Sequence, residues 1–333
     1  MMSSRLSTVA VAVAASLALA ACGGGTETAT PGGSSAQAGP FEYADALGKK
    51  ISLDKTPGVV VAQSSVAAAL SDAGYQVAGV YGELQPGADG KLSYQVGSLD
   101  VSKVQVIGKT YGEFDTEKYA LMNPELLVDY TFDQKALWYV PAAQSEKILG
   151  LAPAIAVPGD YENTDVAIAT FVELAGKLGA DTKSAALTSA KADYDAALKA
   201  VAEAASASGL TVAVMSPGTD SLYVANPSYL PELTTLKNQG LDVMDPVEPD
   251  AQVFTQYSWE SATDYKDADV ILVDARTYDA SKADLAKIAT WANLPAVKAG
   301  QIYPWYAAAP YSYTSYAKIY QELAGQLTAA KKL

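Results

Sequence analysis

The chain has 333 residues, of which 50% are hydrophobic and 18% charged, so it is long enough for two domains with a sizeable core. Its net charge of -14 disfavours binding to nucleic acid, because phosphate backbones are themselves anionic. It contains no histidine and one cysteine, which excludes Ser-His-Asp and Cys-His catalytic sites, histidine-ligated zinc and an intramolecular disulfide. The composition therefore favours a binding protein over an enzyme.

The first segment is typical of a secretion signal. Arg5 precedes an apolar run over residues 9–21, which has the length of a signal-peptide core and is too short for a membrane-spanning helix. The run ends in Leu19-Ala20-Ala21-Cys22, which resembles the bacterial lipobox. The resemblance implies removal of residues 1–21, lipidation of Cys22, and a protein anchored by lipid alone on the extracytoplasmic face of the cell membrane. The alternative is ordinary signal cleavage with an unmodified cysteine.

Residues 22–40 are rich in Gly, Ser, Thr and Pro and are predicted to form a flexible tether. From residue 41 on, short apolar runs alternate with helical segments. Strands are expected over 59–62, 77–81, 104–107, 126–130 and 155–157, and helices over 66–73 and 119–122. This alternation predicts a largely parallel sheet covered by helices, which forms an N-terminal α/β lobe over residues 41–162.

Residues 164–206 show helical spacing throughout and are expected to form one continuous helical stretch, broken softly at Gly179-Ala180. We assign residues 163–180 to a helix that links two lobes. A C-terminal α/β lobe over residues 181–333 follows, with expected strands over 211–215, 270–274 and 301–303 and helices over 230–239, 283–290 and 315–331. The fold class is thus α/β, with two Rossmann-like lobes joined by a single long α-helix.

The order of lipobox, α/β lobe, linking helix and second α/β lobe resembles the class III substrate-binding proteins of ABC importers. The resemblance covers residues 41–333, and its most specific segments read TEKYALMNPELLVDY and WANLPAVKAGQIYPW. It implies a monomeric, non-enzymatic protein that captures a ferric siderophore, haem or cobalamin between its lobes and delivers it to a permease dimer. It also implies that iron arrives as a complete chelate, so we expect no cofactor and no metal ligand from the protein.

Two glutamates match positions that this family uses to dock on its permease. Glu117 precedes the strand expected over 126–130, and Glu260 precedes the strand expected over 270–274. In the family, one glutamate at each place pairs with arginines of the permease. The alternative is that both are solvated residues at helix N-termini, where the helix dipole favours an acid.

Tyrosine is abundant, with 21 residues against 5 phenylalanines, and a ring with a polar tip suits a wet ligand cleft. Ligands of open α/β sheets sit at the carboxyl ends of strands. Strand ends and the following loops therefore predict these binding residues: Tyr81, Tyr111, Tyr130, Tyr223, Arg276, Trp305, Tyr306, Tyr311 and Tyr313. The alternatives are packing within loops for the aromatic residues and an ion pair with Asp274 or Asp279 for Arg276. Tyr316 and Tyr320, four residues apart on the last expected helix, are predicted to pack in the core.

Arg276 is the only arginine after Cys22, and we place only Arg276 and Lys109 near the cleft. Binders of anionic ferric catecholates in this family use several cations, so an acidic, aromatic cleft favours a neutral or cationic ferric hydroxamate of the ferrioxamine type. Haem, which a tyrosine phenolate can ligate, and cobalamin remain alternatives. An anchored hydrolase that uses Asp129 and Asp274 as a carboxylate pair is the alternative of another class.

Overall fold

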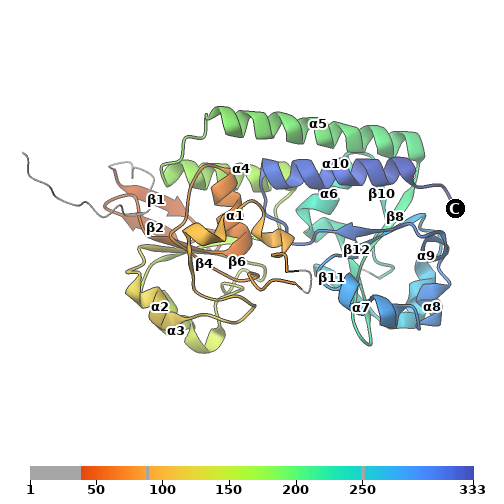
Figure 1. Cartoon of the computed structure of the whole chain (residues 1–333), viewed down its shortest axis with the longest axis horizontal. Helices are drawn as coiled ribbons and strands as arrows, with labels where there is room; N and C mark the ends of the chain where they lie inside the picture. Colours follow the sequence, from red (N-terminus) through yellow and green to blue (C-terminus); the bar gives the residue numbers. More distant parts are fainter. Residues whose placement is uncertain (1–38, 88–89, 249–251) are drawn as a thin grey trace, which may run out of the picture. The chain divides into compact units, whose positions relative to one another are not determined.

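Two separate β-sheets organise the chain, as a computed structural model shows for residues 39–87, 90–248 and 252–333 (Figure 1). Cys22, the signal segment and nearly all of the predicted tether lie outside the described residues. The first sheet has the strand order β5-β4-β3-β6-β7 and all its pairs are parallel. Its strands are β3 (Val60–Gln63), β4 (Gly79–Tyr81), β5 (Gln105–Val106), β6 (Leu126–Thr131) and β7 (Ala154–Pro158).

The second sheet has the order β11-β9-β8-β12-β13, with β10 also paired to β8. In this sheet β8 pairs in parallel with β10 and β12, and β12 with β13, whereas β9 pairs antiparallel with both β8 and β11. The strands are β8 (Thr211–Pro217), β9 (Leu222–Ala225), β10 (Asp242–Val243), β11 (Phe254–Tyr257), β12 (Val270–Asp274) and β13 (Ile302–Trp305). A small antiparallel pair, β1 (Phe41–Ala44) and β2 (Lys50–Leu53), precedes both sheets.

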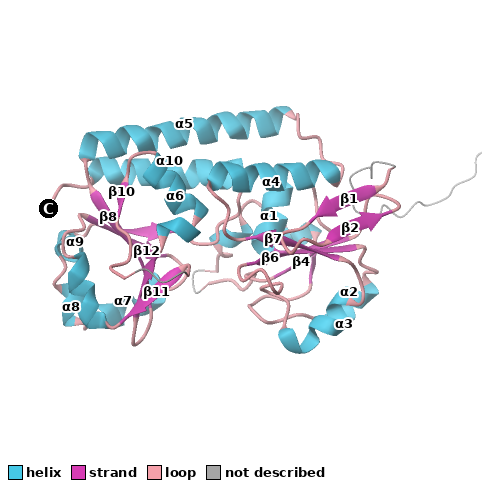
Figure 2. Ribbon diagram, turned by 180° about the vertical axis from the view of Figure 1, so that it is seen from behind, coloured by secondary structure: helices cyan, strands magenta, loops and turns pink. Residues whose placement is uncertain are grey.

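Helices cover both faces of each sheet (Figure 2). α4, α5 and α10 lie along the same side of both sheets, and buried residues of the two sheets join these helices in one continuous hydrophobic core. α2 and α3 cover the other face of the first sheet, and η5 with α7, α8 and α9 covers that of the second. The helices are α1 (Ser64–Asp72), α2 (Thr116–Leu121), α3 (Ser145–Leu149), α4 (Thr164–Lys177), α5 (Ala185–Ser208), α6 (Pro231–Asn238), α7 (Tyr278–Leu285), α8 (Ala289–Ala292), α9 (Pro295–Ala299) and α10 (Tyr313–Ala329).

Short 3-10 helices complete the connections: η1 (Tyr94–Val96), η2 (Val101–Lys103), η3 (Ala142–Gln144), η4 (Pro227–Tyr229) and η5 (Trp259–Tyr265).

The break expected at Gly179-Ala180 within the helical stretch 164–206 is a full turn of the chain between α4 and α5 and not a soft interruption. Gly179 adopts φ 101°, a conformation that residues with a Cβ rarely reach. Ser184 then caps the new helix by accepting a hydrogen bond from the backbone N–H of Leu187 at 3.2 Å. Residues 163–180, predicted to link the lobes, thus form α4. The long helix is the 24-residue α5, which packs along α10 and leads into β8.

Three further differences concern segments in which the sequence pattern is weak. The β1–β2 pair and the antiparallel strands β9 and β11 were not expected, since each is short and only partly buried. The helix expected over 283–290 is divided, with α7 ending at Leu285 and α8 starting at Ala289. Trp305, predicted to lie in a loop, is the last residue of β13.

Candidate functional site

The loops that follow the parallel strands at their carboxyl ends carry four of the nine predicted binding residues, namely Tyr111, Arg276, Tyr306 and Tyr311. In open α/β sheets this edge is where ligands bind. The loops of the two sheets touch here. Tyr94 of η1, in the connection that follows β4, donates a 2.6 Å hydrogen bond from its hydroxyl to the carbonyl oxygen of Ala307, which follows β13. The rings of Tyr94 and Tyr306 lie 5.1 Å apart. The carboxyl edges of the two sheets therefore meet through aromatic side chains.

Arg276 lies beside this contact, two residues after the end of β12. Its Nε and one terminal nitrogen donate to the fully buried Asp274 carboxylate, with a shortest distance of 2.6 Å. Burial alone would lower the pKa of Arg276, but the hydrogen bonds and charge of Asp274 raise it above its usual value, and Tyr94 and Tyr139 add to this electrostatically. The alternative of an ion pair with Asp274 is confirmed. The side chain remains 39% exposed, so part of the guanidinium is free to meet a ligand.

Exposed aromatic residues gather on the side of the first sheet. Tyr111, which follows β5, is 58% exposed, and Trp138, which follows β6, is 45% exposed. The Tyr111 ring lies 6.4 Å from that of Trp138 and 5.2 Å from that of Tyr139, while Phe132 lies 5.3 Å from Trp138. We call Tyr111, Phe132, Trp138 and Tyr139 the aromatic platform. Tyr111 was predicted from the sequence, and the other three were not.

Asp129, a buried residue of β6, positions the backbone of Tyr139 in the aromatic platform. Its buried carboxylate accepts hydrogen bonds from the backbone N–H groups of Tyr130 at 2.7 Å and of Tyr139 at 3.0 Å. The Tyr139 hydroxyl in turn donates to Glu83 at 3.3 Å. Burial raises the pKa of Asp129 to about 7, although these hydrogen bonds oppose the shift. Since Asp129 bonds to backbone and Asp274 to Arg276, the two aspartates are engaged in separate structural contacts.

Four predicted binding residues are core residues. Tyr81, Tyr130, Trp305 and Tyr311 are each at most 5% exposed. The prediction that Tyr81 binds the ligand differs most clearly from the structure. The ring of Tyr81 packs 4.8 Å from that of Phe114, in the hydrophobic cluster under α2 and α3. Strands of a parallel sheet are covered on both faces, so a side chain at a strand end can point into a helix layer instead of toward the edge. Tyr316 and Tyr320 are buried, which confirms the prediction that they pack.

Tyr223 and Tyr313 occupy different surroundings. Tyr223 lies in β9 opposite Ser216, whose hydroxyl donates to Asp274 at 3.1 Å, so it belongs to the same edge as Arg276. Tyr313 starts α10, where its ring packs 5.4 Å from that of Tyr194 of α5. The structure therefore places Tyr313 in the helix layer and not with the other predicted residues.

Glu232 is a buried carboxylate that the sequence analysis missed. It is the second residue of α6, is 4% exposed, and accepts hydrogen bonds from Trp305 Nε1 and the Tyr311 hydroxyl, both at 3.2 Å. Burial raises the pKa of Glu232, although these hydrogen bonds and the charge of Arg276 act in the opposite direction. Trp305 and Tyr311 therefore orient a carboxylate instead of facing solvent. A Pro-Glu pair is common in the first turn of a helix, so the sequence gives no sign that Glu232 is a buried carboxylate.

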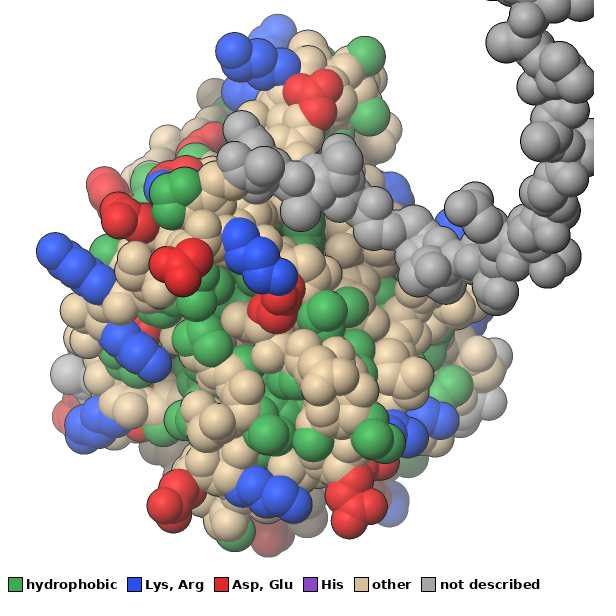
Figure 3. All heavy atoms as spheres, turned by 90° about the vertical axis from the view of Figure 1, so that its left-hand side faces the viewer, with side chains coloured by type: hydrophobic (Ala, Val, Ile, Leu, Met, Phe, Trp, Pro, Cys, Tyr) green, Lys and Arg blue, Asp and Glu red, His purple; other side chains and the backbone are tan. Residues whose placement is uncertain are grey.

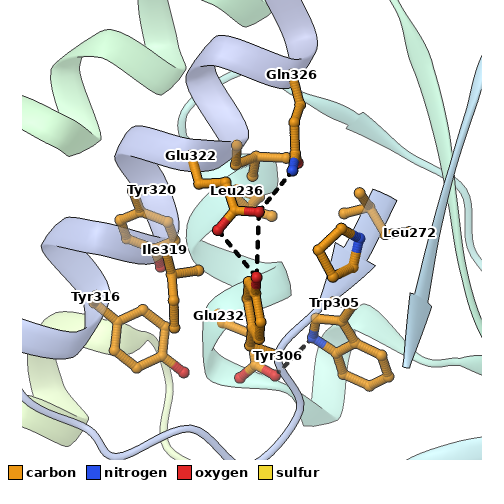
Figure 4. Close-up of a pocket in the computed structure, with 12 residues that line it drawn as sticks. Glu232, Leu236, Leu272, Trp305, Tyr306, Tyr316, Ile319, Tyr320, Glu322 and Gln326 are labelled. Carbon is orange, nitrogen blue, oxygen red and sulfur yellow. Dashed lines mark hydrogen bonds between the residues drawn. The ribbon is translucent and has the colours of Figure 1, made fainter. Parts of the chain in front are cut away.

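A cavity of about 30 Å³ lies next to Glu232, between α6, β13 and α10 (Figure 4). Its lining includes Trp305, Tyr306, Tyr316 and Glu322. Tyr306 contributes its ring to the wall, and its hydroxyl donates to Glu322 at 3.0 Å. A cavity of this size holds roughly one small polar group and is far below the ~300 Å³ or more of a typical ligand pocket.

The two predicted docking glutamates lie at corresponding places in the two sheets. Glu117 is exposed in the first turn of α2, which precedes β6, and Glu260 is exposed in η5, which precedes β12. β6 lies between β3 and β7, which are the first and the last strands of its sheet in the sequence. β12 lies in the same way between β8 and β13. A hydrogen bond from Ser258 lowers the pKa of Glu260.

The described residues contain no group of three or more His, Cys, Asp or Glu side chains placed to hold a metal ion. Within these same residues, helices of the length and apolar character needed to cross a membrane are absent.

Comparison with known proteins agrees with this fold. Residues 86–309 match the model of the periplasmic binding protein family. The crystal structure of DesE, a ferric-siderophore receptor protein from Streptomyces coelicolor, is 37% identical with a TM-score of 0.80, over 88% of this chain and 100% of that one. No curated protein sequence matches the chain.

Two more distant structures share the fold. The siderophore periplasmic binding protein from the fuscachelin gene cluster of Thermobifida fusca is 19% identical, with a TM-score of 0.57 over 81% of this chain and 96% of that one. The siderophore binding protein FhuD from Vibrio cholerae, bound to Fe3+-Desferal, is 20% identical, with a TM-score of 0.58 over 81% and 98%.

The chain belongs to the periplasmic binding protein family, whose model covers more than half of its length. This confirms the family and the α/β fold class expected from the sequence. It also places the chain among binding proteins and not among enzymes, which removes the hydrolase alternative.

Proposed function

We propose that this protein is the substrate-binding lipoprotein of an ABC importer, that it captures a ferric siderophore, and that it delivers this ligand to a permease dimer. The observation that carries the proposal is the contact of Tyr94 with Tyr306 and Ala307 beside Arg276, at the edge where open α/β sheets bind ligands, with Tyr139 of the aromatic platform near enough to act electrostatically on Arg276. The 37% identity to a protein described as a ferric-siderophore receptor supports the same ligand class.

The charge around Arg276 favours a hydroxamate over a catecholate. Asp274 neutralises the guanidinium, and the nearby Glu83 and Glu232 are acidic. A tri-anionic ferric catecholate would meet no net positive charge there, whereas a neutral or cationic trihydroxamate would meet aromatic faces and one exposed guanidinium side.

Tyr94 and Tyr139 are poor candidates for iron ligands. Burial raises the pKa of Tyr94 and of Tyr139 well above that of an ordinary phenol. Direct ligation of haem iron would require a phenolate, which such surroundings disfavour. A siderophore brings its own oxygen ligands, so the protein needs only to surround the complex. The ligand-binding set we propose is therefore the aromatic platform with Tyr94, Tyr223, Arg276 and Tyr306.

Attachment to the membrane follows from Cys22 in this proposal. The protein would act outside the cytoplasmic membrane as a lipid-anchored monomer, with residues 41–162 and 181–333 as its two lobes. Cys22→Ala should release the protein into the medium or leave an uncleaved precursor. A mature Cys22→Ala protein that still partitions into detergent would contradict the anchor.

Mass spectrometry of the ligand retained after mild purification from iron-starved cells tests the ligand class. We expect the mass of an iron(III) trihydroxamate. Recovery of haem or cobalamin instead would overturn the siderophore assignment while leaving the binding-protein fold intact.

A further inference from the structure

Glu232 faces the cavity of Figure 4 without a cationic partner. Its two hydrogen-bond donors, Trp305 and Tyr311, are both neutral, and none of the ion pairs among the described residues includes it. The nearest cation that acts on it, Arg276, is already bound to Asp274. A buried carboxylate that keeps its charge normally has a cation nearby, because the hydration that it loses must be replaced.

Tyr316 provides a second, independent sign that this cavity receives a polar group. Its side chain is 1% exposed, and its hydroxyl, like the buried hydroxyls of four other tyrosines, finds no hydrogen-bond partner among the described residues; it is the one of these that lines the cavity. Figure 4 shows the Tyr316 hydroxyl directed to the side on which Glu232 and Tyr306 lie. A hydroxyl that can still donate and accept thus belongs to a residue that lines the same cavity as a buried carboxylate whose hydrogen-bond donors are both neutral.

The rest of the lining suits a small cation. The rings of Trp305, Tyr306, Tyr316 and Tyr320 contribute to the wall, and aromatic faces attract cations. Glu322 adds a second carboxylate on the exposed side. About 30 Å³ accommodates one ammonium head group but neither an aromatic ring nor an iron chelate.

The cavity lies directly behind the proposed ligand surface. Tyr306 belongs to both, since its ring lines the cavity and also lies 5.1 Å from that of Tyr94. Tyr306 is held by a hydrogen bond to the exposed Glu322, which a ligand can replace. Tyr306 therefore stands between the surface around Tyr94 and the cavity that Glu232 lines, so a movement of this side chain would connect the two.

We infer that this cavity binds the protonated primary amine of the ligand, with Glu232 as its counter-ion and the Tyr316 hydroxyl as a further hydrogen-bond acceptor. This rests on the proposed siderophore function and narrows it to linear chelates that end in an alkylammonium group.

The test compares two probes by fluorescence titration, a linear ferric trihydroxamate with a free terminal amine and the same chelate with this amine acetylated. For the wild type, acetylation should weaken binding at least tenfold, as expected for the loss of a charge-assisted hydrogen bond. In Glu232→Gln the affinities for the two chelates should become equal within about threefold. The affinity of this variant for the acetylated chelate should equal that of the wild type. Tyr316→Phe should reduce the preference for the free amine. Tyr119→Phe, which removes another buried hydroxyl that has no partner among the described residues, is its matched control and should leave the preference unchanged.

The possible results distinguish a failure of the ammonium assignment from a failure of the proposed siderophore function. Equal affinity of the wild type for both chelates would overturn the ammonium assignment, and the cavity would then be a site for water. The proposed siderophore function would not be affected by this result. A preference for the free amine that persists in Glu232→Gln would also overturn it, because the selection would then lie elsewhere. If neither chelate binds to the wild type, the proposed function fails and the assignment fails with it. If the melting curve shows that Glu232→Gln does not fold, Tyr316→Phe is the deciding variant. An unchanged preference of Tyr316→Phe for the free amine over the acetylated one would overturn the assignment.

Discussion

The Tyr94 hydroxyl donates to the Ala307 carbonyl oxygen at 2.6 Å and thereby joins a loop of the first sheet to a loop of the second. This hydrogen bond links segments more than two hundred residues apart in the chain. It lies at the edge that we assign to the ligand, so it is placed to influence both stability and ligand exchange.

Tyr94→Phe should therefore lower the free energy of unfolding by about 1 kcal/mol and speed up ligand dissociation, because the ring stays but the bond is lost. Denaturant titration and stopped-flow fluorescence measure the two effects. Tyr306→Phe is the control, since it loses only a bond to the exposed Glu322, and its stability should change by less than ~0.5 kcal/mol. Equal stability of Tyr94→Phe and the wild type would show that the contact between the edges is incidental.

Arg276→Ala should weaken ligand binding by about 10- to 100-fold, the cost of a hydrogen bond to a charged group. It should also lower the melting temperature, because the buried Asp274 would keep only Ser216 and a backbone N–H as donors. Arg276→Lys keeps the charge without the planar fork and should recover part of the stability but little of the affinity. Unchanged affinity in Arg276→Ala would assign this arginine to Asp274 alone.

Asp129 should make stability depend on pH. Since burial raises its folded pKa to about 7, the folded state favours the protonated acid, and this contribution is present at low pH and lost as the pH rises toward 7. The wild type should be less stable at pH 8 than at pH 5 by on the order of 2 kcal/mol from this group. Asp129→Asn should show a smaller difference between the two pH values in urea titrations. An equally steep dependence in the variant would assign the effect to other groups.

The fold followed from local patterns more readily than the site did. The central strands β3, β6, β8 and β12 are short apolar runs, and α1, α6 and α10 follow helical spacing, so their positions were predicted within a few residues. The break at Gly179-Ala180 was predicted, but its extent over 178–184 was underestimated because helical spacing continues on both sides of Gly179.

The site depends on contacts between distant segments, which no local pattern encodes. Tyr111, Arg276 and Tyr306 were found because they follow strands. Trp138 and Tyr139 were missed because nothing in the sequence places their loop against Tyr111, and Glu232 because its burial comes from Trp305 and Tyr311 about 75 residues away. Tyr81 was misassigned because a strand end alone does not say which face a side chain takes.

Replacing Glu117 and Glu260 together by Ala should abolish most uptake while leaving ligand affinity within about threefold, a change of less than ~1 kcal/mol. Both side chains are exposed, and neither lies among the residues around Arg276. The end of the molecule seen in Figure 3 shows acidic, basic and apolar side chains interspersed, without a broad field of one charge. A large loss of affinity in the double variant would instead place these residues in the ligand site.

Tryptophan fluorescence titration of the wild type with ferrioxamine, ferric enterobactin and haemin, at low and high salt, distinguishes the three classes of ligand. The neutralised Arg276 and the surrounding aromatic residues predict that ferrioxamine binds most tightly, saturably and with little dependence on salt. If haemin or the catecholate binds more than tenfold tighter than the hydroxamate, or if salt strongly weakens binding, the account of this site as an aromatic receptor for an uncharged or cationic iron chelate is contradicted.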